Sequence, residues 1–370
     1  MKTALIDRRL MVHFDSPLVI LSVLLMAIGV LNLYSTTSGD EIRGIPIYLR
    51  QLLWFSVGFF VMLLIAFFDY RYYKSLAYAF FAASLVPLLT LLMYRMATGG
   101  VQRWIRFGSF SFQPSEWVKI CLVLALATYF SKHPKTDGYL LRDLIIPFLG
   151  TAVPVLLVLL QPDLGTAIAL FLILFSMLFF VKIQLKSFLI LAVSGLAALP
   201  LLWHYFLKAY QKERVLTFLN PDMDPLGAGY HIQQSKIAIG SGGVFGKGFL
   251  AGTYTKLGFI PARHTDFILC NLAEEWGFVG AFAVLTLFLL LLLWGLRISL
   301  HSKDRFGAIT AFGIVVLIFW QVFINTGMVL GIMPVVGIPL PFISYGGSSA
   351  LTVMAGIGLL LNISMRRYMF

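Results

Sequence analysis

Charged side chains are scarce in this sequence. Asp, Glu, Lys and Arg make up only 12% of its 370 residues, against about a quarter in soluble domains. Hydrophobic residues account for 59%, and the mean hydropathy is +0.90. This balance excludes an ordinary soluble domain and predicts an integral membrane protein.

Cysteines and acidic residues are also few. Cys121 and Cys270 lie in or beside apolar runs, where a thiol behaves as a small hydrophobe, so neither a disulfide framework nor a cysteine metal site is indicated. The chain has only 16 acidic residues but 28 basic ones, which gives a net charge of +12. Because the basic residues form short clusters between apolar runs, the membrane explains them and no nucleic-acid partner is expected.

Apolar runs of the length that spans a bilayer, about 20 residues each, recur along nearly the whole chain. We predict helices at 17–36, 51–68, 76–94, 115–130, 144–160, 164–181, 185–204, 267–296, 307–330 and 348–364. These runs leave little room for a separate soluble domain. The expected fold is all-α: one polytopic membrane domain, residues 1–370, with ten transmembrane helices.

The basic residues also predict an orientation. An even number of helices places both termini on one side, and Lys2, Arg8 and Arg9 precede the first helix. Most Lys and Arg residues of the short loops fall on that same side, as expected for cytoplasmic loops. Both termini are therefore expected in the cytoplasm.

One loop is long, running over residues 205–266 between the seventh and eighth predicted helices on the outer side. Loops of this length without a function are uncommon. Within it, residues 230–239 have helical spacing and glycines follow from position 240. We expect an interfacial or re-entrant helix followed by a glycine-rich turn.

Asp266 ends this loop, immediately before an apolar run. An ionisable group at the edge of the membrane is a functional-site hypothesis by default. Arg263 and His264 precede it and are expected to favour its ionised form. The alternative, left open by the spacing, is that Asp266 caps the N-terminus of the eighth helix.

Other carboxylates also admit two interpretations. Glu116 and Lys119 are three residues apart and share a helix face, as a structural ion pair or as part of a site. Asp163 precedes the sixth helix, as its cap or as a substrate contact. Glu274, inside the eighth helix, is expected to be a hydrogen-bonded carboxylate or to pair with Lys119.

The residues on the outer side indicate a phosphorylated substrate. Arg103, Arg214 and Lys236 belong to outer loops, and such side chains bind phosphate oxygens. Residues 334–349 are rich in proline and glycine, and irregular backbone at this depth is expected to wall a cavity. Sugar transfer from a lipid diphosphate needs one base, because the diphosphate leaves without a proton when cations stabilise it. A glycoside hydrolase normally needs a second carboxyl group, so these residues fit a transferase better.

The chain resembles the SEDS family (shape, elongation, division and sporulation) in motifs that occur in order. They are Gln-Arg-Trp at 102–104, Phe-Gln-Pro-Ser-Glu at 112–116, Gln-Pro-Asp-Leu-Gly-Thr at 161–166, Asp-Pro-Leu-Gly-Ala-Gly-Tyr-His at 224–231, His-Thr-Asp-Phe-Ile at 264–268 and Ser-Tyr-Gly-Gly-Ser at 344–348. The stretch 233–242 looks more like the elongation member than the division member. One departure is Ala262, where the family commonly has an acid.

The resemblance implies a bacterial inner-membrane enzyme, with its active site facing the periplasm, that polymerises lipid II into glycan strands with a class B penicillin-binding protein. It also implies that Asp266 is the essential carboxylate and that a divalent cation, Mg²⁺ or Mn²⁺, takes part at an unknown site. Residues expected to contact substrate are Arg103, Glu116, Lys119, Asp163, Arg214, Lys236, His264, Thr265 and Ser344.

Two other classes of protein remain as alternatives. A lipid II flippase would also need a polar cavity among its helices, although the charged groups gather at the outer side. A catalytically silent scaffold would not need Asp266 at all.

Overall fold

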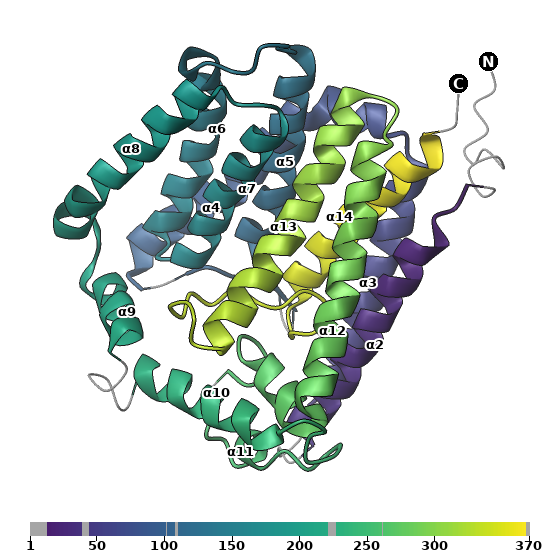
Figure 1. The fold of residues 1–370 in the computed structure, drawn as a ribbon, viewed down its shortest axis with the longest axis vertical. Coiled ribbons are helices and arrows are strands. Elements are labelled where there is room, and N and C mark those ends of the chain that lie inside the picture. Colours follow the sequence, from purple (N-terminus) through teal and green to yellow (C-terminus); the bar gives the residue numbers. More distant parts are fainter. Residues whose placement is uncertain are drawn as a thin grey trace.

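The computed structural model of this chain describes residues 13–38, 44–100, 102–107, 110–220, 227–260 and 262–367. It is a bundle of long helices (Figure 1). The ten helices that coincide with the ten predicted segments are α2 (Ser16–Thr37), α3 (Ile47–Phe67), α4 (Tyr70–Thr98), α5 (Pro114–Lys132), α6 (Leu141–Leu160), α7 (Leu164–Phe180), α8 (Leu185–Leu201), α12 (Ile268–Leu300), α13 (Arg305–Val329) and α14 (Gly347–Arg366).

The all-α membrane architecture is confirmed. Among the described residues, 8 helices are long and apolar enough to cross a membrane. The two others are α7, an apolar helix of 17 residues, and α5, which carries Glu116 and Lys119 near its start. The number of ten membrane spans therefore stays a prediction.

Burial separates the centre of the bundle from its edge. In the apolar stretch of α14, 100% of the residues are buried inside the bundle, whereas in that of α8 only 6% are. Glycines let α14 approach α3 closely: a Cβ at Gly347 would lie 2.2 Å from the Trp54 ring, and one at Gly358 would lie 2.6 Å from the Met62 carbonyl oxygen. The core thus forms around α14, while α8 stands at one side of the bundle (Figure 1).

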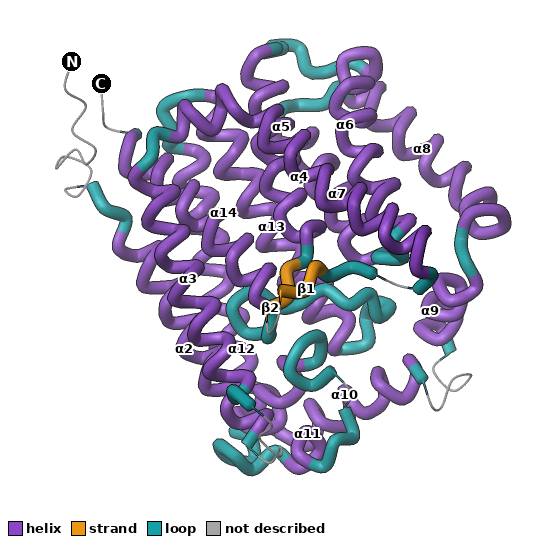
Figure 2. The backbone as a smooth tube through the Cα atoms, turned by 180° about the vertical axis from the view of Figure 1, so that it is seen from behind, coloured by secondary structure: helices purple, strands orange, loops and turns teal. Residues whose placement is uncertain are grey.

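A short antiparallel hairpin, β1 (Ile105–Phe107) and β2 (Phe110–Phe112), lies between α4 and α5 and pairs Ile105 with Phe112. The sequence analysis predicts no strand here, because three-residue strands carry too little periodicity to be recognised. Figure 2 shows the hairpin against the loop-rich side of the bundle.

The long loop contains helices of its own. A π-helical turn, η1 (Leu202–Phe206), follows α8, and then come α9 (Ala209–Leu219), α10 (Ala228–Gly242) and α11 (Thr253–Lys256). The predicted helix at 230–239 is confirmed within α10. The motif residues 224–226 lie outside the described residues.

The glycine-rich turn after α10 packs on α12. The Lys247 amide donates to the Glu274 carbonyl at 3.0 Å, and the Phe278 amide donates to the Gly243 carbonyl at 2.9 Å. At this point α12 is interrupted at Gly277, where φ is 67° and a Cβ would lie 2.3 Å from the Gly246 nitrogen. The expectation of one continuous eighth helix is therefore wrong at Gly277, because the loop backbone takes over its hydrogen bonds.

A tight contact holds the segment 331–346, between α13 and α14, against α2. A Cβ at Gly29 would lie 2.1 Å from the Phe342 carbonyl oxygen.

We predict that Gly29→Ala lowers the free energy of unfolding by about 1–3 kcal/mol, as overpacking of a core does. The measurement is the thermal unfolding midpoint of the purified protein, which should fall. Gly150→Ala is the matched control, because a Cβ there meets nothing within 4 Å. Equal midpoints for the two variants would contradict the contact.

Candidate active site

Asp266 lies half-buried just before α12, and its backbone is held from α13. The Asn325 side-chain nitrogen donates to the Asp266 carbonyl at 2.9 Å and to the Ile338 carbonyl at 2.8 Å. One buried amide therefore fixes Asp266 and the segment 331–346 relative to each other. Asn325 is not among the site residues predicted from the sequence, although a polar Asn inside the apolar run 307–330 is the signal that identifies such a residue.

The segment 331–346 forms one wall beside Asp266, as expected of the proline- and glycine-rich stretch. The Ser344 hydroxyl donates to the Thr265 carbonyl at 2.6 Å, and the Tyr345 amide donates to the His264 carbonyl at 2.9 Å. A Cβ at Gly337 would lie 3.4 Å from Asp266 Oδ2. The Ser344 hydroxyl and the Tyr345 amide therefore hold the Asp266 loop through the carbonyls of Thr265 and His264.

The surroundings of the Asp266 carboxylate change its proton affinity. Burial raises the pKa of Asp266 to about 6, the Arg214 guanidinium opposes that rise, and the Asp163 carboxylate adds to it. Arg214 is thus a cation that acts on Asp266 from a distant part of the chain, and the expectation that Arg263 and His264 favour the ionised form stays a prediction. Because a pKa of about 6 lies below 7, the carboxylate is mostly ionised at neutral pH.

The capping alternative for Asp266 is not supported. Helix α12 begins at Ile268, Phe267 occupies the N-cap position, and no side chain caps it by a hydrogen bond. In the described part of the chain, no hydrogen bond reaches the Asp266 carboxylate, so it remains available to a substrate.

Asp163, by contrast, is confirmed as the N-cap of α7. Its carboxylate accepts from the Thr166 amide at 3.2 Å and from the Thr166 hydroxyl at 2.9 Å. It also accepts from the Gln113 side chain at 3.2 Å, which joins the start of α7 to the start of α5. Asp163 therefore influences Asp266 through its charge while its own oxygens are occupied.

The three expected phosphate-binding cations differ in their surroundings. Arg103 donates to the Pro162 carbonyl and, at 3.1 Å, to the Gln161 carbonyl, so it supports the turn before α7. Arg214 of α9 donates to the Val335 carbonyl at 3.1 Å. Lys236 of α10 is exposed. Arg214 therefore combines a fixed position with electrostatic action on Asp266.

Lys236 reaches the other end of the same segment. A Cβ at Gly331 would lie 2.2 Å from Lys236 Cε, so the Lys236 stem rests on the segment 331–346. Its exposed position leaves its ammonium group accessible to an anion.

Glu116 and Lys119 form the predicted ion pair in α5. Lys119 Nζ lies 2.8 Å from Glu116 Oε1, and both side chains are buried. The hydrogen bonds of the described residues do not join this pair to Asp266. The backbone amide of Gln113, the N-cap residue of α5, donates to the Ser348 hydroxyl at 2.8 Å, which ties the start of α5 to α14.

The proposed pairing of Glu274 with Lys119 is wrong. Glu274 Oε1 lies 2.7 Å from Lys247 Nζ and accepts from the Thr253 and Tyr254 amides at 2.8 and 3.0 Å. The alternative of a hydrogen-bonded carboxylate is confirmed. The partner differs because the loop turn after α10 folds back onto α12, a contact that helical spacing cannot show.

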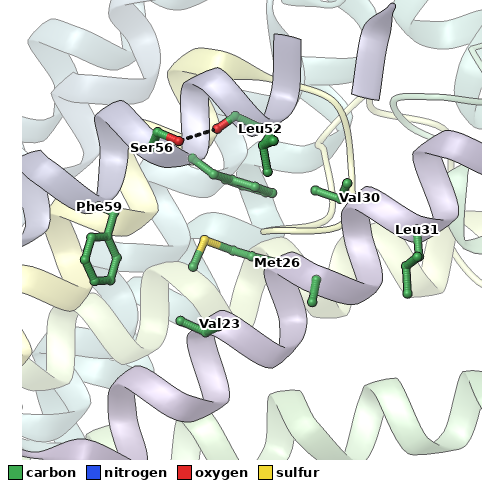
Figure 3. A pocket seen from close by; sticks show the side chains of 9 residues that line it. Val23, Met26, Val30, Leu31, Leu52, Ser56 and Phe59 are labelled. Atoms are coloured by element: carbon green, nitrogen blue, oxygen red, sulfur yellow. Dashed lines mark hydrogen bonds between the residues drawn. The ribbon is translucent and has the colours of Figure 1, made fainter. Parts of the chain in front are cut away.

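One face of α3 supports the site and another faces outward. Gln51 Oε1 accepts from the Gly346 amide at 3.1 Å, next to the start of α14. The outward face forms an apolar groove of about 690 Å³ with α2, lined by residues such as Met26, Leu52 and Phe59 (Figure 3). This groove is suited to contact with lipid chains.

A family model for FtsW, RodA and SpoVE, described as a cell cycle protein, matches residues 16–369. The chain belongs to the FtsW/RodA/SpoVE family. It is 38% identical over 358 residues to the peptidoglycan glycosyltransferase MrdB of Escherichia coli K12, covering 97% of this chain and 95% of that protein. It is 33% identical to the peptidoglycan glycosyltransferase RodA of Treponema pallidum, covering 96% and 98% of the two chains.

Solved structures agree with this membership. A chain from a structure titled "Structural coordination of polymerization and crosslinking by a peptidoglycan synthase complex" is 34% identical, with a TM-score of 0.82 over 96% of this chain and 99% of that one. The crystal structure of the Thermus thermophilus rod shape determining protein RodA is 31% identical, with a TM-score of 0.70 over 96% and 98%. The predicted family and its multi-pass membrane fold are therefore confirmed.

For this member of the FtsW/RodA/SpoVE family, the Glu116–Lys119 pair allows a direct test of its role. We predict that Lys119→Met costs about 3–5 kcal/mol, because it leaves a buried carboxylate without its cation. The double variant Glu116→Gln/Lys119→Met is expected to recover most of that loss. Thermal unfolding of the three proteins measures both effects. A single variant as stable as the parent protein would exclude a structural role.

Proposed function

We propose that this chain, a peptidoglycan glycosyltransferase of the FtsW/RodA/SpoVE family that acts in cell shape, polymerises lipid II into β-1,4 glycan strands with Asp266 as general base. The observation that carries the proposal is the Asp266 carboxylate itself. It is partly buried, is positioned through its backbone by Asn325, and accepts no hydrogen bond from the described residues. Its pKa of about 6 suits a base at neutral pH.

The proposed reaction uses one proton acceptor. Asp266 takes the proton of the acceptor sugar 4-hydroxyl as that oxygen attacks the anomeric carbon of the donor strand. The bond from the anomeric carbon to the diphosphate oxygen breaks, and the configuration inverts. The diphosphate leaves as an anion that cations stabilise, so no second carboxyl group is required as an acid.

Two cations are best suited to hold the diphosphates. Arg214 lies within electrostatic reach of Asp266, and Lys236 carries an exposed ammonium group on the same segment 331–346. Arg103 acts instead by supporting the turn that presents Asp163. Glu116 and Lys119 form a buried ion pair within α5.

A divalent cation would need ligands from the substrate as well as from the protein. Among the described residues, no group of three or more His, Cys, Asp or Glu side chains is arranged to hold a metal ion. Mg²⁺ commonly uses one or two carboxylates together with substrate phosphates, and the open Asp266 carboxylate fits that donor set. Such an ion would neutralise charge on the diphosphate.

The cellular setting of this proposal follows from its relatives. The neighbour titled as a peptidoglycan synthase complex couples polymerisation to crosslinking, which supports a class B penicillin-binding protein as partner. The basic loops support a bacterial inner-membrane location with both termini in the cytoplasm and Asp266 facing the periplasm.

Removing the base tests the proposal. Asp266→Asn is expected to lower polymerisation by about 10²–10⁴-fold, the usual contribution of a general base, while the thermal unfolding midpoint changes little. Purified protein, its partner and labelled lipid II are incubated, and glycan chains are resolved on a gel. Asp163→Asn serves as the comparison, because Asp163 is a cap and is expected to lose stability as well.

Other outcomes separate the alternatives. Full polymerisation by Asp266→Asn would exclude the base assignment. Lipid II translocation in vesicles without polymerisation would favour a flippase, and rod shape maintained in cells by Asp266→Ala would favour a scaffold.

The pH profile provides a second test. Because the base must be ionised, kcat/KM is expected to fall as pH drops through about 6, the pKa of Asp266. Arg214→Gln removes the charge that lowers this pKa, so the midpoint is expected to move to higher pH, whereas Arg214→Lys retains it. Arg142→Gln, which removes an exposed arginine of α6, is the control and should leave the midpoint in place. An unchanged midpoint in Arg214→Gln would contradict the assigned electrostatics.

A further inference from the structure

A small polar cavity lies at the end of the bundle opposite Asp266. It has a volume of about 250 Å³ and is formed where α2 begins and where α12 and α14 approach their C-terminal ends. Figure 1 shows these helix ends together. Its polar lining comes from His13, Asp15, Trp294, Arg297, Ser364 and Arg367. Trp294 lies beyond the break at Gly277, roughly 25 Å from it along α12 at about 1.5 Å per helical residue.

The single acid of this lining is already engaged. Asp15 Oδ1 accepts from the Trp294 indole nitrogen at 2.6 Å, and Asp15 Oδ2 accepts from the Ser364 hydroxyl at 2.5 Å. Both carboxylate oxygens therefore join α2 to α12 and α14. This arrangement directs the acid toward the walls and leaves basic groups to define the charge of the cavity.

Two guanidinium groups supply that charge. Arg297 lies over the Trp294 ring at 4.9 Å from its centroid, so the indole face orients it at the rim. Arg367 follows the last turn of α14 and lines the same cavity. With Asp15 counted, the lining still carries an excess of positive charge before any contribution from His13.

The N-terminus of α2 adds to this potential. The helix has 22 residues, no side-chain cap and no acidic residue in its first turn, and Asp15 and Pro17 at its start line the cavity. An uncapped helix N-terminus favours an anion. The C-terminal ends of α12 and α14 oppose this effect, but each carries an arginine of the cavity lining, Arg297 in the last turn of α12 and Arg367 at the C-cap of α14.

We propose that this cavity binds the phosphate group of an anionic membrane lipid. Its size is below the roughly 300–1,000 Å³ of pockets for drug-sized ligands, which suits a headgroup phosphate. Trp and Arg at helix ends are typical of headgroup depth in a bilayer. Basic pockets between transmembrane helices bind anionic headgroups in this way. The site is independent of the proposed function of Asp266.

The experiment titrates the purified full-length protein in a neutral detergent with short-chain phosphatidylglycerol, short-chain phosphatidylcholine or inorganic phosphate. The shift of the thermal unfolding midpoint reports binding to the folded state. Phosphatidylglycerol is expected to stabilise the protein more than phosphatidylcholine. The double variant Arg297→Gln/Arg367→Gln is expected to bind it on the order of tenfold more weakly, or worse, because each basic side chain contributes to attraction of an anionic headgroup.

Two further variants keep the test decisive. Arg142→Gln removes an exposed arginine of α6 outside the cavity and should bind phosphatidylglycerol like the parent protein. Asp15→Asn keeps an acceptor for Trp294 while removing a negative charge, so its affinity should rise; a purely structural role for the cavity would not produce that gain. If the double variant fails to fold, Arg297→Lys/Arg367→Lys replaces it and should retain binding.

Three results would overturn the proposal. The first is an equal response to phosphatidylglycerol and phosphatidylcholine. The second is unchanged phosphatidylglycerol affinity in the double variant, with no gain in Asp15→Asn. The third is that inorganic phosphate saturates the site at concentrations no higher than those that phosphatidylglycerol requires. A soluble phosphate, and not a lipid, would then be the ligand.

Discussion

The site depends on one constraint: irregular backbone at membrane depth must have its polar groups satisfied by protein. The segment 331–346 connects α13 to α14, and its hydrogen bonds involve a side chain of α13, one of α3 and its own Ser344. Asn325 donates to Ile338, Ser344 bridges to Thr265, and Gln51 accepts from Gly346. Asn325 also donates to the Asp266 carbonyl and Ser344 to that of Thr265, so the same polar groups stabilise the segment and define the site.

The buried carboxylates show how unevenly partners are distributed. Asp163 is occupied by a cap, Glu116 by Lys119, and Glu274 by Lys247 and two backbone amides. These contacts compensate the cost of taking a charge out of water. Asp266 has electrostatic support from Arg214 but no hydrogen-bond donor on its carboxylate among the described residues, and burial raises its pKa. A carboxylate kept in this condition is better explained by chemistry than by stability.

The charged groups at the two ends of the bundle have different surroundings. At the Asp266 end, cations from α9 and α10 lie along an irregular segment beside a single open acid. At the opposite end, both carboxylate oxygens of Asp15 accept hydrogen bonds, and Arg297 and Arg367 line a small cavity. Helix α12 connects the two, and its break at Gly277 lets the long loop pack against it.

Periodicity and composition alone determined the membrane class, the ten helical segments, the helix inside the long loop and the Glu116–Lys119 pair, because these follow from local spacing along a helix. The ordered motifs pointed to the family and to Asp266. Tertiary structure alone decided the partner of Glu274, the break in α12, the role of Arg103 in a turn and the influence of Arg214 on Asp266. Each of these joins residues far apart in the chain, and a single sequence carries no distance between them.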